Sequence, residues 1–379
     1  MERTNPYLNN IAFYLLMLFA IVLILSNALA EFMAALMLMI WIAQSLAYRR
    51  REWINYPLFK PIAALILYKI IVLIASGYRG NIGVPLEQIT LPFLYFIVPT
   101  IVVTVERRWK IVWLFISGAI IAAGIGTIKY LVGNDKVATS TVSGCYTLSN
   151  YLIIILGFLM VAFVFSKQAR DKIFLGLISI PLIAGLIFTF TRAGYLVGAF
   201  YIIILGIFKD RKLFIPVILI AASIYILSPS TVERLVQRFD ISNKKQFYSH
   251  RDDVIDFAKT KINEVGFFGY GINSYPDLAK DSDNPRINDL VLKTWHNLYL
   301  EYLFDGGPFA LVILFWIIFS QVRYSLARYR KTKDIKQKSF QLGILMLILA
   351  IIVIGMFADP LRDPIISMLF WVLLGLSII

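Results

Sequence analysis

The sequence predicts an all-α polytopic membrane protein with about 12 transmembrane helices and one large loop that contains short helices. Three observations support this class. Hydrophobic residues make up 59% of the 379 residues, charged residues make up only 16%, and the mean hydropathy is +0.75. Apolar blocks of about 20 residues, long enough to cross roughly 30 Å of hydrocarbon, recur along the whole chain. Soluble, disordered and fibrous proteins do not combine these properties.

Twelve spans are predicted from these apolar blocks. They cover residues 10–27, 30–47, 60–77, 88–105, 110–131, 150–166, 173–190, 192–208, 213–229, 306–327, 340–358 and 364–379. The first block has no small-residue cleavage site after it, so we expect a retained span and no removed signal peptide. Only Thr191 to Gly194 can turn the chain between the seventh and eighth spans, and the orientation of every later span depends on that turn.

The positive charges predict the orientation of the spans. The chain has 37 Lys and Arg against 23 Asp and Glu, a net charge of +14. Alternate loops each hold at least three cations, whereas the short loops between them hold one or two, as at Arg79, Arg192 and Arg362. Cation-rich loops are cytoplasmic in membrane proteins. Both termini are therefore predicted to be cytoplasmic, and the net charge indicates topology, with no nucleic acid as partner.

The sequence divides into three parts. Residues 1–229 hold spans one to nine, residues 230–305 form a long external loop, and residues 306–379 hold spans ten to twelve. Loops of this length usually carry function. Two amphipathic helices are expected in it, STVERLVQRFD and SHRDDVIDFAKTKINEV, and the second places Val254, Ala258 and Ile262 on one face that can lie on the membrane. The segment GFFGYGINSYPD after it is a glycine-rich turn region.

Two arginines on the external side are candidates for anion binding. Arg192 lies at the external end of a hairpin of spans, where it is either an interfacial anchor or an anion clamp. Arg251 lies at the start of the second loop helix. It either pairs locally with Asp252 and Asp253 or binds a phosphate together with the helix N-terminus.

Further candidates flank the last three spans. His296 in TWHNLYLEYLFDGG is either a structural interfacial residue or a group that activates or orients a hydroxyl. Asp359 in ADPLRDP either caps a helix end, with Arg362 as a possible partner, or orients an acceptor. Lys69 is a charge at membrane level.

Metal and nucleotide sites are not expected. One cysteine and two histidines exclude a multi-cysteine site and disfavour a zinc centre. Asp281 and Asp283 form a D-x-D pattern of the kind that holds a divalent ion in nucleotide-sugar enzymes, but the predicted topology places it outside, away from such donors. The glycine-rich segment lacks the P-loop spacing. Energy for a reaction outside must therefore come from a lipid-linked donor or an ion gradient.

Three stretches together resemble the O-antigen ligases and the related O-antigen polymerases of bacterial envelopes. They are FTFTRAGYLVG around Arg192, SHRDDVIDFAKTKINEVGFFGYGINSYP around Arg251 and HNLYLEYLFDGG at His296. The resemblance implies a GT-C-like membrane glycosyltransferase among the lipids of the bacterial inner membrane, with its active site facing the periplasm. Such an enzyme transfers a glycan from undecaprenyl diphosphate to a sugar hydroxyl of lipid A-core in lipopolysaccharide biosynthesis. The reaction is inverting and needs no metal, cofactor or nucleotide.

The resemblance also implies roles for individual residues. Arg192 and Arg251 would bind the diphosphate and offset the charge of the leaving group, and His296 would act on the acceptor hydroxyl. Asn297, Tyr299 and Asp359 would bind substrate. The acidic pair after Arg251 and the compact loop depart from the family pattern.

Three alternatives stay open. An O-antigen polymerase or a protein O-oligosaccharyltransferase shares these motifs, although the moderate loop and the ADPLRDP end favour a ligase. In a transporter for a lipid-linked glycan or an anion, Lys69, Arg192 and Asp359 would line a pathway. Few intramembrane charges, no visible inverted repeat and the concentration of polar sequence in one loop argue against the transporter.

Overall fold

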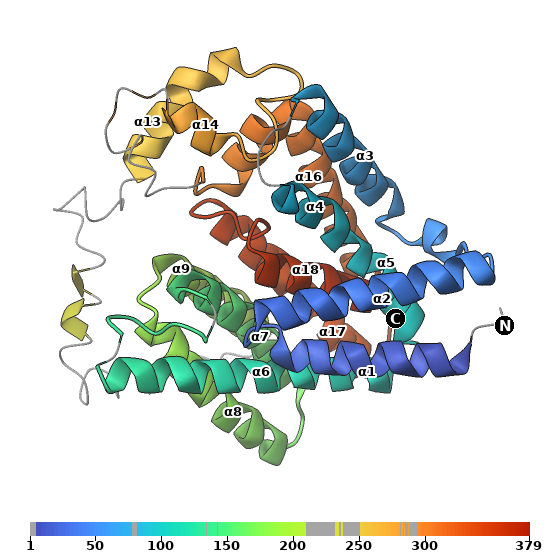
Figure 1. The fold of residues 1–379 in the computed structure, drawn as a ribbon. Coiled ribbons are helices and arrows are strands. Elements are labelled where there is room, and N and C mark those ends of the chain that lie inside the picture. The colour runs from blue at the N-terminus through green and yellow to red at the C-terminus, as the bar shows by residue number, and fades with distance from the viewer. Residues whose placement is uncertain are drawn as a thin grey trace.

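A computed structural model describes residues 5–77, 82–133, 135–141, 143–209, 251–280 and 294–379, with a few single positions between 232 and 287 (Figure 1). Helices, turns and loops make up these ranges, and they contain no strand. The longer helices are α1 (Pro6–Val22), α2 (Asn27–Ala47), α3 (Phe59–Ala75), α6 (Val105–Leu131), α7 (Cys145–Phe165), α8 (Ala169–Phe188), α9 (Arg192–Phe208), α13 (Arg251–Lys261), α16 (Leu298–Lys331), α17 (Ile335–Gly355) and α18 (Pro364–Leu376).

Every predicted span within the described ranges falls on a helix. The ninth, 213–229, lies outside them. The fourth is built from three pieces, α4 (Gly83–Thr90), η2 (Leu91–Phe93) and α5 (Leu94–Ile101), because Pro92 interrupts the regular helix. Seven of the described helical segments are long and apolar enough to cross a membrane, and α1, α9 and α18 are shorter apolar helices. The described part of the chain, in which helices are the only regular secondary structure, thus fits a polytopic membrane protein.

A tight turn separates the seventh and eighth spans, but it lies earlier than the predicted Thr191 to Gly194, because Arg192 to Gly194 already belong to the next helix. Helix α8 ends at Phe188 and α9 begins at Arg192. Only three residues join them, and the middle one, Phe190, has a left-handed backbone with φ of 51°. A positive φ reverses the chain within few residues. The prediction of two separate helices at 173–190 and 192–208 is therefore confirmed.

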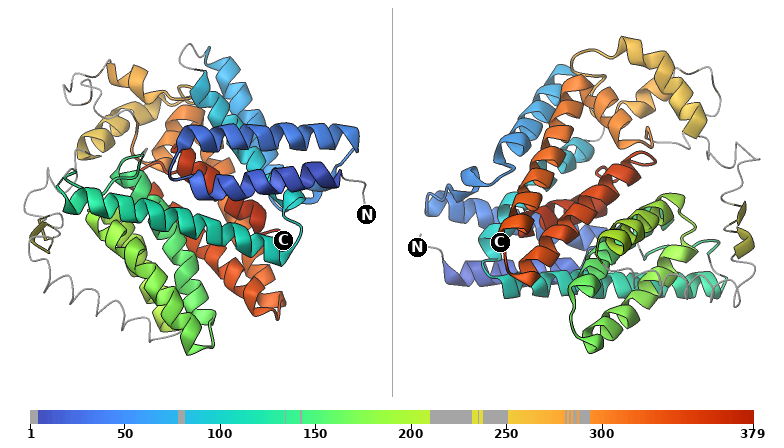
Figure 2. Two further views of the ribbon diagram at one scale, coloured as in Figure 1. Left: turned by 60° about the horizontal axis from the view of Figure 1, so that its bottom comes forward. Right: turned by 180° about the vertical axis from the view of Figure 1, so that it is seen from behind.

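Helices α7 and α17 form the centre of the bundle. Within their apolar windows 72% and 78% of the residues are buried, compared with 22% in α8. Helix α17 packs on α7 and α16, α16 packs on α3, and α18 packs on α5. Seen from behind, the C-terminal helices lie between the N-terminal helices and the α6–α9 group (Figure 2, right). A helix that is apolar on all sides is expected in such a central position.

The helix α13 packs on protein and does not use its apolar stripe to bind the membrane. Val254 and Ala258 are buried in a second apolar cluster, and only Ile262 of the predicted stripe is exposed. Trp295 forms the centre of the cluster, with ring centroids 4.0 Å from Phe304 and 5.7 Å from Phe257. The expectation that this apolar stripe faces the membrane was wrong, because aromatic residues from distant parts of the sequence bury it within the protein. The short helix α14 (Tyr275–Lys280) completes this cluster.

Helix α16 begins eight residues before the predicted tenth span. Asn297 caps it, since its Oδ1 accepts hydrogen bonds from the backbone N–H groups of Tyr299 at 2.9 Å and Leu300 at 3.1 Å. The helix is then interrupted at Gly307, where φ is 71° and ψ is −176°. Hydropathy missed the first two turns because Glu301 and Asp305 interrupt the apolar run there.

Replacing Gly307 by alanine is expected to destabilise the protein by about 1–3 kcal/mol or more. Its backbone conformation is essentially restricted to glycine, and an added Cβ would overlap the carbonyl oxygen of Phe267. Gly124→Ala in α6 is the matched control, because its Cβ would meet no atom within 4 Å and alanine favours helix. Thermal unfolding in detergent measures both. Equal melting temperatures for the two variants would contradict the close approach.

Candidate functional site

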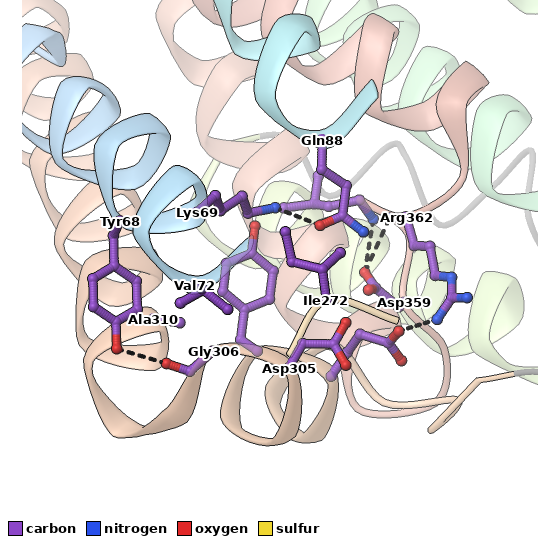
Figure 3. Close-up of a pocket in the computed structure, with 13 residues that line it drawn as sticks. Tyr68, Lys69, Val72, Gln88, Ile272, Asp305, Gly306, Ala310, Asp359 and Arg362 are labelled. Carbon is purple, nitrogen blue, oxygen red and sulfur yellow. Dashed lines mark hydrogen bonds and ion pairs between the residues drawn. The ribbon is translucent and has the colours of Figure 1, made fainter. Parts of the chain in front are cut away.

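A buried charged pocket lies where α3, α4, α16 and the turn between α17 and α18 meet (Figure 3). Two cations and three carboxylates line it. The full lining consists of Tyr68, Lys69, Val72, Gln88, Ile272, Glu301, Tyr302, Asp305, Gly306, Ala310, Asp359, Leu361 and Arg362.

Arg362 is the central residue of this pocket. Its guanidinium donates to Glu301 Oε1 and to the side-chain oxygen of Asn273. The sequence suggested that the Arg362 side chain pairs with Asp359. Asp359 Oδ1 instead accepts hydrogen bonds from the backbone N–H groups of Leu361 at 3.0 Å and Arg362 at 3.2 Å. Burial raises the pKa of Asp359 to about 6, and the charge of Arg362 opposes this shift. Arg362 thus connects the α17–α18 turn with both α16 and the loop.

The other charges attach the loop and α3 to their neighbours. Asp305 accepts the backbone N–H groups of Asn273 at 2.7 Å and Ser274 at 2.9 Å, and the Ser274 hydroxyl at 2.7 Å. Lys69 Nζ donates to Gln88 Oε1 at 2.8 Å. Carboxylates that accept several hydrogen bonds are held in one geometry. The pocket is therefore a rigid polar connection between segments far apart in the sequence.

His296 lies at the edge of this network in a left-handed backbone conformation, with φ of 47°. The N–H of the preceding Trp295 donates to Glu301 Oε2 at 3.1 Å, and the following Asn297 caps α16. Burial lowers the pKa of His296 to about 4, and the positive charges of Arg251 and Arg362 act in the same direction. The imidazole is therefore neutral at pH 7 and keeps one unprotonated ring nitrogen, although the lowered pKa makes it a weaker base than an ordinary histidine.

Acidification is expected to destabilise the wild-type protein through His296. Its pKa is about 4 in the folded chain and 6.5 ordinarily, so the unfolded chain binds the proton first as the pH falls below 6.5. Stability is therefore lost between pH 6.5 and pH 4. Melting temperatures at pH 7 and pH 5 should differ more for the wild type than for His296→Gln. An equal drop in both proteins would show that His296 titrates normally.

Arg251 lies in the first described turn of α13. Within the described part of the chain it forms no ion pair, so the predicted local pairing with Asp252 and Asp253 is not seen there. Burial lowers the pKa of Arg251, and Tyr146 at the start of α7 opposes this shift. A half-buried guanidinium without an ionic partner in these ranges is suited to an anionic ligand.

Arg192 is the first residue of α9, which packs on α7. Gly194 of α9 packs so closely on α7 that an added Cβ would overlap the Ser149 hydroxyl. One turn earlier on α7, Tyr146 acts on Arg251, and Thr147 donates to Asp363 of the α17–α18 turn. The start of α7 is thus the common neighbour of both arginine-bearing helices and of that turn.

Asn297 and Tyr299 have structural partners. Asn297 donates to the carbonyl of Met356 at 3.1 Å, in addition to capping α16, and the Tyr299 hydroxyl donates to the carbonyl of Ile352 at 2.9 Å. These bonds connect the start of α16 to the end of α17. Asn297 directly follows His296 in the chain, and the substrate contacts expected of Asn297 and Tyr299 stay a prediction.

The sequence interpretation missed two functional candidates, Glu301 and Asp305. Their spacing of four residues places both carboxylates on one helix face, and charges within an apolar stretch are a signal of function. Asn273 and Gln88 gave no such signal. Asp281, Asp283 and His250 lie outside the described residues, and in the described ranges no group of three His, Cys, Asp or Glu side chains is arranged to hold a metal.

The fold and the pocket define a multi-pass helical membrane protein with a rigid charged site beneath a helical loop. Residues 177–315 match the family model described as O-Antigen ligase. The matched segment includes Arg192, Arg251, His296, Glu301 and Asp305. It confirms the resemblance to the O-antigen ligase family and indicates a glycosyltransferase of the ligase or polymerase type. No curated protein matches the chain.

Proposed function

We propose that this protein is an O-antigen ligase that transfers a glycan from undecaprenyl diphosphate to a sugar hydroxyl of lipid A-core, without metal, cofactor or nucleotide. The observation that carries the proposal is Arg251, which has no ionic partner among the described residues and whose charge acts on a neutral, half-buried histidine, His296. An anion site beside a proton acceptor is the minimum that transfer from a diphosphate requires. The family match supports this reaction type.

In the proposed reaction, Arg251 and Arg192 bind the two phosphates of the donor. The acceptor hydroxyl attacks the anomeric carbon from the face opposite the diphosphate, and the bond between that carbon and the phosphate oxygen breaks. The hydroxyl proton passes to His296. The two guanidinium groups stabilise the charge that develops on the leaving diphosphate, and the anomeric configuration inverts.

The buried network is proposed to orient the groups that react. Glu301 bonds both Arg362 and the backbone N–H next to His296, so it fixes the imidazole relative to the pocket. Asp359 is the carboxylate proposed to orient the acceptor, because its backbone hydrogen bonds hold it at the pocket wall. Asn297 and Tyr299 support His296 from the α17 side.

The proposed location is the bacterial inner membrane, with both termini cytoplasmic and the loop, residues 230–305, in the periplasm. The alternation of cation-rich and cation-poor loops supports this orientation. Both proposed substrates are amphiphiles with their glycans in the periplasm, so a site at that membrane face can reach them.

The purified protein should be incubated with the lipid-linked glycan and lipid A-core in nanodiscs, with chelator and without nucleotide. A ladder of core-linked glycan on a gel is the expected result. Longer lipid-linked glycans without attachment to the core would favour a polymerase, and glycan attached to protein would favour a protein O-oligosaccharyltransferase. Unchanged substrates in nanodiscs, together with passage of the lipid-linked glycan across the bilayer when the protein is placed in sealed liposomes, would favour the transporter.

A further inference from the structure

Three exposed aromatic rings form a patch at the junction of the loop and α16. Phe267 and Phe268 belong to the glycine-rich turn, residues 266–269, and Phe309 belongs to α16. Their side chains are 55%, 40% and 47% exposed. The ring centroids of Phe267 and Phe309 lie 4.3 Å apart, and those of Phe267 and Phe268 lie 5.0 Å apart. We call these three residues the aromatic patch.

The aromatic patch is held in place by the backbone around it. The Tyr68 hydroxyl of α3 lies within hydrogen-bonding distance of the carbonyl oxygens of Phe267, at 2.9 Å, and Gly306, at 2.8 Å. The Tyr270 N–H donates to the Phe304 carbonyl at 2.7 Å. Gly269, with φ of 67°, allows the turn to approach α16 at its break. The exposure of these rings is therefore a fixed property of the fold.

The patch continues the outward faces of α16, which is long and apolar enough to cross a membrane, and of α3, which covers the predicted span 60–77. Tyr68 lies on α3 with its ring centroid 6.2 Å from Phe268 and 6.4 Å from Phe309. Helices α3 and α16 pack side by side (Figures 1 and 2). Exposed apolar side chains follow the patch along both of them, namely Leu67, Ile71, Ile74, Val312 and Phe319. On a membrane protein such surfaces face lipid.

We propose that the aromatic patch inserts into the lipid interface and anchors the loop to the membrane beside the charged pocket. Aromatic side chains concentrate at the boundary between headgroups and acyl chains. Lys261 and Glu264, which precede the patch in the chain, pair with each other at 3.3 Å, so this part of the loop brings little net charge to the interface. A lipid surface is the partner that fits, because it already covers the helices on which the patch continues.

The anchor fixes the depth of the pocket. The break at Gly307 contacts the turn that carries Phe267, so the membrane boundary lies close to this break. Glu301 and Asp305, which precede it on α16, then lie at the level of the headgroups. An amphiphile can reach the pocket from the bilayer without leaving the interface. The depth of the patch in the membrane does not depend on which reaction the site performs.

Spin labels test the anchor, since the chain has a single cysteine, Cys145. In a Cys145→Ala background, Phe268→Cys is labelled with a nitroxide in phospholipid nanodiscs. Two matched controls are Val312→Cys on the exposed face of α16 and Asp277→Cys on α14, where the aspartate side chain is 82% exposed. Power saturation compares collisions of each label with oxygen, which partitions into lipid, and with a water-soluble nickel chelate.

The label at Phe268 is expected to collide more with oxygen than with nickel, as at Val312, whereas the label at Asp277 should show the reverse. A Phe268 label that follows Asp277 would place the patch in water and overturn the proposal. Low collision rates with both reagents, or dipolar broadening between labels, would show that a protein surface covers the patch, and would overturn it as well. Phe267→Cys replaces Phe268→Cys if the latter lowers the folded yield.

Discussion

Replacing Arg251 by alanine is expected to lower the rate of glycan transfer by about 100-fold to 1,000-fold. The substitution removes a half-buried guanidinium that has no ionic partner within the described chain, so its main loss is the interaction with the donor diphosphate. Arg192→Ala should lose activity in the same way. Rates of transfer by purified, correctly folded variants in nanodiscs measure the effect.

Lys259→Ala is the matched control for Arg251. It lies on the same helix, α13, and its ammonium is exposed and pairs with Asp256 at 2.7 Å. Because exposed ion pairs contribute at most about 1 kcal/mol, this variant should transfer glycan nearly normally. Arg251→Lys should also be impaired, since a point charge lacks the two-pronged geometry. Normal rates for Arg251→Ala would remove this residue from the diphosphate site.

Loss of Arg251 should also change a property that is measured without an activity assay, the pKa of His296. Its charge lowers the pKa of His296, so in Arg251→Ala the pKa should rise above about 4, while burial keeps it below 6.5. The chain has only two histidines, which makes isotope-labelled imidazole signals simple to assign. An unchanged titration would mean that Arg251 is not close to His296.

Replacing Arg362 by alanine is expected to reduce the stability of the folded protein by about 3–5 kcal/mol. Glu301 and Asn273 both lose the guanidinium, and the buried Glu301 and Asp305 carboxylates and the half-buried Asp359 carboxylate are left with one cation in the pocket lining, Lys69. A carboxylate that loses its partner in a low-dielectric site keeps its desolvation cost. Resistance to thermal unfolding in detergent measures the loss.

Two variants separate the loss of the ion pair from general damage at Arg362. Arg362→Lys keeps the charge but not both hydrogen bonds, so it should recover only part of the stability. Adding Glu301→Gln to Arg362→Ala should also recover part, because the glutamine carries no charge and its side-chain oxygen can still accept the Trp295 N–H. A double variant that is less stable than Arg362→Ala would contradict the pairing as the cause.

Features that depend on neighbouring residues could be predicted from the sequence, whereas features that depend on residues far along the chain could not. The spans were predictable because membrane helices satisfy their own backbone hydrogen bonds and need only a local run of apolar residues. Arg192, Arg251 and His296 could be proposed as site residues from the sequence because each lies in a short motif. The face of α13 was predicted wrongly because the residue that covers it, Trp295, lies far along the chain.

The sequence by itself determined the membrane class, the helices and the polar residues near the predicted external face. Only the tertiary structure decided their partners. Arg362 pairs with Glu301 across 61 residues and with Asn273 across 89, and no local pattern distinguishes these pairs from Arg362 with Asp359. The break at Gly307 likewise depends on the approach of Phe267. Hydropathy depends on neighbouring residues, whereas a buried ion pair depends on how helices pack, and packing brings together residues that the chain separates.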